Sequence, residues 1–162
     1  MANDVGSEAI DRPDSLTGGN TYILLDNPAT EDGIIDTVEL YLHQAVASTF
    51  KVCIFSDEGG GGGAGQYKAT NCALLGAVDA GSKQTFTGLN LTIKTGEYIG
   101  WYFSVAGSIQ LTSSGEAGQL RDGGDHTDGG TTYYALNAGQ TVSLRGTGAG
   151  AAVGGGDMFQ VF

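Results

Sequence analysis

Hydrophobic and polar residues alternate most clearly in Gln84–Ser104, near the middle of the chain. In Leu89–Lys94 an aliphatic residue stands at every second position with a polar residue between, which predicts a strand with one buried face. The turn Thr95–Glu97 interrupts the alternation, and Tyr98–Phe103 resumes it with β-branched and aromatic residues. This stretch therefore predicts an antiparallel hairpin with a glycine-containing turn.

Gly100 lies inside the second strand of this hairpin, on the face that carries Tyr98 and Tyr102. A glycine in a strand interior leaves room for a neighbouring backbone, an aromatic side chain or a ligand to approach closely. We favour packing within the protein over a ligand site.

The same alternation, broken by turn residues, recurs along most of the chain, and helical periodicity is almost absent. Short strands with frequent turns predict an all-β protein, and their number favours an antiparallel β-sandwich of jelly-roll-like arrangement. The other predicted strands are Tyr22–Leu25, Ile34–Leu42, Phe50–Phe55, Tyr67–Leu75, Ile109–Thr112, Gln119–Arg121, Thr131–Leu136 and Gln140–Arg145.

Composition divides the chain into three parts. Residues 1–20 show little periodicity and many Asp, Ser and Gly residues, which predicts an N-terminal arm with at most one helical turn near Ser7–Ile10. Residues 21–147 form the predicted β-sandwich domain. Residues 148–162 are the predicted glycine-rich linker and C-terminal strand.

The C-terminal segment Asp157–Phe162 is apolar and follows the glycine-rich run 146–156. That run could span about 35 Å when fully extended. An exposed apolar strand promotes aggregation, so we expect Asp157–Phe162 to be covered. We favour completion of its own sheet, with pairing to another subunit by strand addition as the alternative. The expected assembly contacts are Met158, Phe159, Val161 and Phe162.

The charge balance argues against nucleic acid as a partner. Seven basic and 18 acidic residues give a net charge of −11, which repels phosphate. The N-terminus lacks the basic start and apolar run of a secretory signal, and no apolar run approaches the length of a membrane span, so no membrane partner is expected.

The run Asp57–Gly65 is a glycine-rich connector, which its composition predicts to be flexible. It lacks the Lys-Ser/Thr ending of a phosphate-binding loop, so a nucleotide site is not expected. Cys53 and Cys72 lie on neighbouring predicted strands and could form a disulfide. We favour two free thiols, because a disulfide requires an oxidising environment.

Candidate catalytic and metal-binding residues are few. The loop Asp122–Asp128 holds three carboxylates and His126, which could bind Ca²⁺, although its spacing is not that of an EF-hand and a solvated loop is favoured. His43 is the other histidine, and neither histidine accompanies a nucleophile motif. Glu39 and Glu97 lie in or beside strands without a feature that selects them as a glycosidase pair. The sequence predicts no catalytic residue, metal or cofactor.

Aromatic residues supply the remaining candidates for binding. Stacking on a sugar and contact with another subunit both fit exposed tyrosines, and we favour contact because tyrosine is enriched at interfaces. The tyrosines expected to face outward are Tyr41, Tyr98, Tyr102, Tyr133 and Tyr134.

Three segments, Val78–Leu91, Thr95–Gly100 and Ser143–Gly148, resemble small β-rich structural proteins of tailed bacteriophages. The likeness covers roughly Thr21–Gly148 and consists of turn and strand residues, while the Gly59–Gly63 run and the apolar C-terminal segment lie outside it. The resemblance implies a non-enzymatic protein of the virion, with a capsid decoration protein as the leading interpretation.

Such a protein would form homo-oligomers and contact other virion proteins through its terminal arms. The alternative is a carbohydrate- or receptor-binding module of a phage tail or fibre, with a host glycan as its partner and the outward tyrosines as its binding surface.

Overall fold

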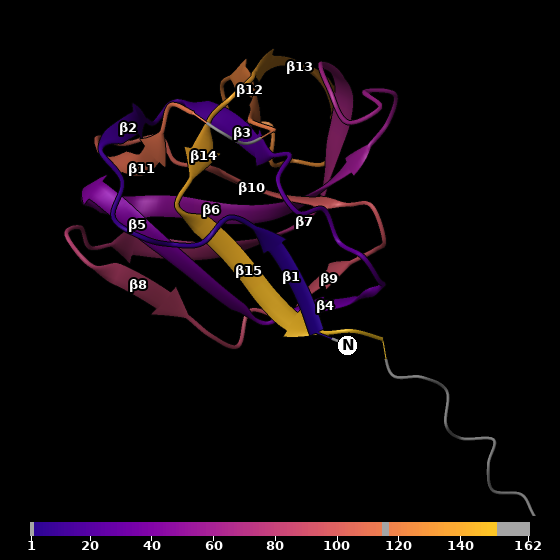
Figure 1. The fold of residues 1–162 in the computed structure, drawn as a ribbon, viewed down its shortest axis with the longest axis horizontal. Coiled ribbons are helices and arrows are strands. Elements are labelled where there is room, and N and C mark those ends of the chain that lie inside the picture. The colour runs from indigo at the N-terminus through magenta and orange to yellow at the C-terminus, as the bar shows by residue number, and fades with distance from the viewer. Residues whose placement is uncertain (1, 115–116, 152–162) are drawn as a thin grey trace, which may run out of the picture.

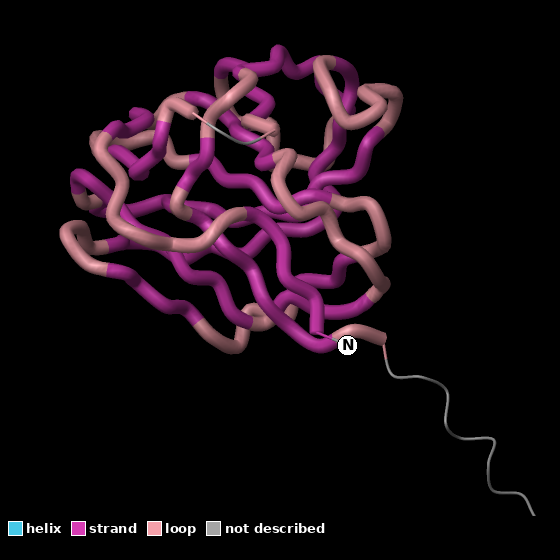
Figure 2. The backbone as a smooth tube through the Cα atoms, in the orientation of Figure 1, coloured by secondary structure: helices cyan, strands magenta, loops and turns pink. Residues whose placement is uncertain are grey.

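The computed structural model describes residues 2–114 and 117–151, and each regular element in this part of the chain is a strand (Figure 1, Figure 2). All strand pairs are antiparallel. The prediction of an all-β antiparallel protein is therefore confirmed. The strands are β1 (Ala2–Gly6), β2 (Asp14–Thr17), β3 (Asn20–Leu24), β4 (Gly33–Ile35), β5 (Thr37–Gln44), β6 (Val46–Asp57), β7 (Gly65–Val78), β8 (Lys83–Phe86), β9 (Leu91–Ile93), β10 (Tyr98–Tyr102), β11 (Ser108–Thr112), β12 (Gln119–Gly123), β13 (Thr131–Asn137), β14 (Thr141–Val142) and β15 (Leu144–Ala149).

The strands form two large sheets and one small ladder. In the open sheet the order is β1-β15-β5-β11-β14, with β2 also paired to β11 and β8 also paired to β5. In the closed sheet six strands pair round a ring in the order β10-β3-β12-β13-β7-β6. The ladder joins β4 to β9. Figure 1 shows the open sheet beside the ring, with the ladder near the chain's N-terminus.

Buried apolar side chains gather in two clusters. The first core cluster lies between the open sheet, the β4–β9 ladder and one wall of the closed sheet, and the second core cluster lies inside the ring. The first contains Val5, Tyr22, Leu24, Ala29, Ile35, Val38, Leu40, Leu42, Val46, Phe50, Val52, Ile54, Val78, Leu91, Ile93, Ile99, Trp101, Phe103, Ile109, Leu111, Val142 and Leu144. The second contains Ile23, Leu25, Cys53, Phe55, Tyr67, Ala69, Leu120 and Tyr134.

Strands β3, β6 and β10 form a shared wall, because their two faces serve different clusters. In β3, Tyr22 and Leu24 belong to the first cluster, whereas Ile23 and the adjoining Leu25 belong to the second. The run Val52–Phe55 of β6 alternates in the same way. A strand buried on both faces needs apolar residues at successive positions, which accounts for the continuous apolar runs in these segments.

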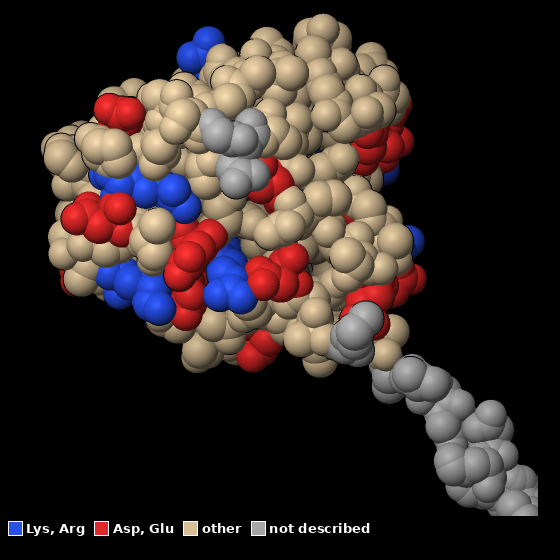
Figure 3. Space-filling model, viewed as in Figure 1, with Lys and Arg blue, Asp and Glu red and all other residues tan. Residues whose placement is uncertain are grey.

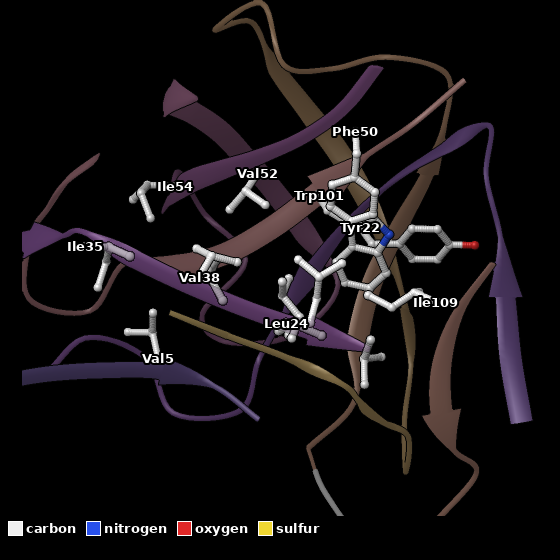
Figure 4. Close-up of a cluster of buried hydrophobic side chains, with 14 of the residues drawn as sticks. Val5, Tyr22, Leu24, Ile35, Val38, Phe50, Val52, Ile54, Trp101 and Ile109 are labelled. Carbon is white, nitrogen blue, oxygen red and sulfur yellow. The ribbon is translucent and has the colours of Figure 1, made fainter. Parts of the chain in front are cut away.

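Aromatic stacking fills the first cluster around the shared wall. Trp101 of β10 is fully buried and stacks on its partner Tyr22 of β3, with ring centroids 4.8 Å apart (Figure 4). Phe50 stacks on Phe103 with a centroid separation of 5.4 Å. Each such pair adds about 1 kcal/mol to the stability that its buried area already provides.

Gly100 of β10 faces the interior of the ring, where there is no room for a side chain. A Cβ atom there would lie 2.1 Å from the carbonyl oxygen of Tyr22 and 2.7 Å from the ring of Phe55. The gap predicted at this position is thus filled by a backbone and an aromatic ring of the protein itself, which confirms the packing interpretation.

The predicted hairpin between Leu89–Lys94 and Tyr98–Phe103 is wrong. The turn exists, since the N–H of Glu97 bonds to the carbonyl of Lys94, but β9 pairs with β4 while β10 inserts between β3 and β6. The side chains of β9 and β10 meet in the first core cluster instead of along a shared ladder. Apolar alternation specifies which face of a strand is buried, but it does not specify which strand becomes its partner.

The N-terminal residues also differ from expectation, because they belong to the sheets and form no separate arm or helical turn. Strand β1 pairs with β15 over five residues, and β2 pairs with β11. Asn3 and Val5 are fully buried while Asp4 between them is exposed, so β1 alternates with only one apolar inward residue. That weak signal explains why residues 1–20 were predicted as an arm.

The first residues of the glycine-rich run, 146–149, also belong to a strand instead of a linker. Gly146 and Gly148 lie in β15, where a Cβ would come within 2.8 Å of Ile99 and 1.8 Å of the carbonyl oxygen of Ile34. These glycines permit close packing, so the prediction of a linker is wrong for residues 146–149. The predicted C-terminal strand Asp157–Phe162 lies outside the described residues.

Cys53 and Cys72 form a disulfide and stand directly opposite each other on β6 and β7. The expectation of two free thiols is therefore wrong. The bridge closes a loop with a sequence separation of 19 residues, and a loop of that size contributes about 3 kcal/mol in the chain-entropy account. Its formation requires an oxidising environment.

We predict that Gly100→Ala destabilises the fold by about 1–3 kcal/mol, because the added methyl group displaces the Tyr22 backbone or the Phe55 ring. Urea unfolding followed by tryptophan fluorescence measures the change. The matched control is Gly123→Ala in β12, where the nearest atom to the new Cβ is 3.7 Å away. Equal stability of the two variants would contradict the packing account.

Candidate functional site

The tyrosines predicted to form an outward binding surface are dispersed through the structure. Tyr134 is only 1% exposed and belongs to the second core cluster, so the expectation that it faces outward is wrong. Tyr98 packs against the same cluster and meets Tyr67 edge-on, with centroids 6.0 Å apart. Both rings therefore stabilise the interior of the closed sheet.

The other three tyrosines lie in separate surroundings. Tyr41 of β5 donates a hydrogen bond to the carbonyl of Gly81, and the ammonium of Lys51 lies 5.8 Å from the centroid of the Tyr102 ring. Tyr133, on the outer face of β13, is 60% exposed. The five tyrosines give no continuous aromatic surface for a sugar.

Carboxylates of the acidic loop Asp122–Asp128 have partners within the protein. The ammonium of Lys51 lies 2.8 Å from Asp125, and His126 Nε2 lies 2.8 Å from Asp122. Burial alone would raise the pKa of Asp125, but hydrogen bonds from Lys51 and Thr127 lower it below its usual value. Within residues 2–114 and 117–151 no three His, Cys, Asp or Glu residues are arranged to hold a metal ion. The structure does not support the calcium hypothesis.

Glu39 and Glu97, the other candidate carboxylates, have structural partners. Glu39 pairs with Lys83 at 3.5 Å, and the carboxylate of Glu97 accepts the N–H of Lys94. His43 is exposed at the end of β5. Both cysteines are part of the disulfide, so neither has a free thiol that could form a Cys–His nucleophile pair.

The loop between β6 and β7 is organised around one carboxylate. Asp57 accepts hydrogen bonds from the N–H groups of Gly59, Gly60 and Gly62, at 2.9, 2.6 and 3.0 Å. Burial works to raise the pKa of Asp57, but the backbone N–H groups of Gly59–Gly62 together lower it below its usual value. The glycine run predicted to be flexible by composition is therefore an ordered loop.

This loop packs onto the aromatic residues inside the ring. The hydroxyl of Tyr67 donates to the carbonyl of Gly63, and a Cβ at Gly60 would lie 2.4 Å from the Tyr67 ring. Burial, with the nearby Asp57 carboxylate and Tyr98, raises the pKa of Tyr67 to about 12. Because glycine lets the backbone rest on the ring, the loop covers Tyr67 and leaves it little room to meet a ligand.

A cavity of about 430 Å³ lies between the N-terminal segment and the end of β3. Arg12 on its wall donates hydrogen bonds to Ser143, Thr112 and the carbonyl of Glu8. Asp26 accepts the hydroxyl of Ser7. These contacts attach the segment between β1 and β2 to both sheets.

The two ends of the described chain meet at one place, which we call the terminal corner: β1, residues 147–151 and the turn Glu31–Gly33. Arg145 makes two hydrogen bonds to Asp4, at 2.8 and 2.6 Å, and the side-chain amide of Asn3 donates to the carbonyl of Glu31. Gly150 bridges to Gly33, and the N–H of Ala151 bonds to the carbonyl of Asp32. The chain is thus held firmly up to Ala151, beside β1 (Figure 1).

Charges near the terminal corner are mixed in sign. Figure 3 shows Lys and Arg interspersed with Asp and Glu on this face of the molecule. Arg145 forms an ion pair with Asp4, and Lys83 forms one with Glu39. Exposed pairs of this kind contribute about 1 kcal/mol or less each.

A scan against protein-family models matched no family, and searches of curated proteins and of solved structures returned no significant match. Among the described residues, no helix has the length and apolar character that crossing a membrane requires.

We predict that Asp57→Ala destabilises the protein by about 1–2 kcal/mol at pH 7, because three backbone N–H groups lose a charged acceptor. The folded-state pKa of Asp57 is lowered, so its contribution is complete above the unfolded-state pKa of about 3.9 and is lost as the pH falls through the folded-state value. Urea unfolding of both proteins between pH 2 and 7 measures the difference.

The control is Asp128→Ala, which removes an exposed loop carboxylate that accepts the N–H of Gly130. A pH-independent difference between Asp57→Ala and the wild type would show that the carboxylate does not organise the loop through its charge.

Proposed function

We propose that this chain is a non-enzymatic structural protein of a virion, a bacteriophage capsid decoration protein that assembles through its C-terminal segment. The observation that carries the proposal is the terminal corner. It holds Ala151 rigidly beside an edge strand, and the apolar segment Asp157–Phe162 follows after only five residues. Each copy therefore carries an apolar segment that a short linker joins to a rigid body.

The composition of that segment supplies the energy for assembly. Met158, Phe159, Val161 and Phe162 are large and apolar. Complete burial of one such side chain contributes about 1.5–3 kcal/mol, so the four together contribute about 6–12 kcal/mol toward ordering and docking a short strand. A second copy provides a surface for this burial without requiring any other partner.

The body suits repeated attachment to a particle. A disulfide links β6 to β7, and two core clusters are joined through the shared wall. The resemblance of Val78–Leu91 and Ser143–Gly148 to small phage structural proteins motivates the location on a virion.

The finer architecture belongs to the same proposal. The open sheet faces β3, β6 and β10 across the first core cluster, as two sheets of a sandwich do. We regard this part as the jelly-roll-like sandwich, and the closing of the ring by β7, β12 and β13 as an addition to it. The alternative function, binding of a glycan or receptor, gains no support from the dispersed tyrosines.

Removal of residues 152–162 is predicted to convert the protein from an oligomer to a monomer near 15.5 kDa, about 1 kDa below the 16.5 kDa of the full chain. Size-exclusion chromatography with light scattering measures the mass. A length-matched control replaces Met158, Phe159, Val161 and Phe162 with serine and is expected to behave like the deletion. A full-length protein that is already monomeric at high concentration would refute assembly through this segment.

The virion location predicts that the chain copurifies with particles at a fixed ratio to the major capsid protein. Quantitative mass spectrometry of particles from a density gradient tests this. Enrichment only in the unassembled fraction would contradict it.

A further inference from the structure

Strand β7 is paired along most of one edge but along only a short part of the other. On one side β6 pairs with it from Tyr67 to Val78. On the other side β13 pairs only with the stretch Gly65–Lys68. In the part of the chain that the structure describes, the stretch 69–78 therefore presents its second edge without a strand partner.

The β6–β7 register shifts between Ala69 and Asn71 and between Leu74 and Val78, so the regular part of this edge is 71–74. Between Lys68 and Asp79 there is no charged residue and no proline, and Leu74 is 67% exposed. The outer side of β1, by comparison, is engaged at Gly6, which donates its N–H to the carbonyl of Asp26 and accepts the side-chain amide of Asn27. A bare apolar edge on a folded protein is a template for another strand.

The edge is also held rigid. Ala73 and Leu75 pack against the first core cluster, and Cys72 on the opposite face is bonded to Cys53. The side-chain amide of Asn71 donates to the carbonyl of Thr92 at 2.8 Å. A preformed strand loses little conformational entropy when a second strand joins it.

We propose that the 69–78 edge of β7 binds Asp157–Phe162 of a second copy by strand addition. The inference rests on the proposed function and names its acceptor surface. The donor segment has six residues, four of them large and apolar, and its only charge within the chain is at Asp157. It is therefore short enough to pair within the ten-residue uncharged edge, and it is similarly apolar.

The tether constrains the assembly. Residues 152–156 span about 17 Å when extended, so donor and acceptor bodies must lie close together. Each copy carries one donor segment and one acceptor edge on different surfaces. Reciprocal donation between two copies gives a twofold dimer, and onward donation to a further copy gives a closed ring or an extending lattice.

The test separates donor from acceptor. Leu74→Glu adds a charge to the acceptor edge and keeps the donor segment. Leu74 lies opposite Lys51 across the β6–β7 pair, so the new carboxylate lies next to a positively charged residue. Deletion of 157–162 removes the donor and keeps the edge. Each variant alone is expected to be monomeric at concentrations where the wild type assembles.

Leu74→Glu lacks an acceptor edge and the deletion variant lacks a donor segment, so the two are complementary. A 1:1 mixture is expected to form a heterodimer of about twice the monomer mass in light scattering. The matched control is Tyr133→Glu on β13, where an aromatic of similar exposure becomes a carboxylate, and it is expected to assemble like the wild type.

A peptide of residues 154–162, titrated into the deletion variant labelled with ¹⁵N, provides a readout that is independent of folding defects. Amide shifts are expected to concentrate at residues 69–78. Shifts confined to another surface would overturn the β7 assignment.

The two failures are distinguishable. If the deletion abolishes assembly but Leu74→Glu does not, the acceptor lies elsewhere and the proposed function survives. If neither variant changes the mass of the wild type, assembly through the tail fails as well. If the wild type is monomeric and its β7 amides are protected by its own tail at every concentration, the tail pairs with β7 of the same copy. That result would overturn pairing between copies.

Discussion

The double-sided burial of β3, β6 and β10 is the constraint on which the rest of the structure depends. One face of this wall contacts the open sheet and the other closes the ring, so each residue along it must fit a different cluster from its neighbours. Gly100 is required where Phe55 and the Tyr22 backbone approach, and Trp101 is fixed by Tyr22 on the opposite face. A change in register by one residue would exchange the two faces and disrupt both clusters.

Glycine has two roles around that wall that composition does not distinguish. In the β6–β7 loop, left-handed glycines at Gly61 and Gly62 let backbone N–H groups turn toward Asp57. In β15, Gly146 and Gly148 remove side chains where the strand approaches β4 and β10. Both segments are ordered because their glycines make close contacts possible, and the firm attachment of β15 fixes where the C-terminal segment leaves the body.

Hydrophobic alternation in the sequence identified the buried faces of the central strands, but it did not identify which strands pair with each other. The central strands were identified because Leu91, Ile93, Ile99 and Trp101 mark buried faces, yet the partners of β9 and β10 depend on contacts far along the chain. Strand β1 was missed because Val5 is its one large apolar residue. Tyr134 was placed outward because neighbouring tyrosines give no sign of which one enters the ring. The free edge of β7 could not be predicted, since it exists only because β13 pairs with four of its residues.

In the proposed assembly, a rigid body contributes one strand edge, 69–78, and one apolar segment, Asp157–Phe162. Hydrogen exchange of the full-length protein, measured by mass spectrometry over a range of protein concentrations, tests this most directly. We predict that the amides of residues 69–78 become more protected as concentration rises, while those of the shared wall stay equally protected throughout. Exchange at residues 69–78 that is fast and independent of concentration would contradict it.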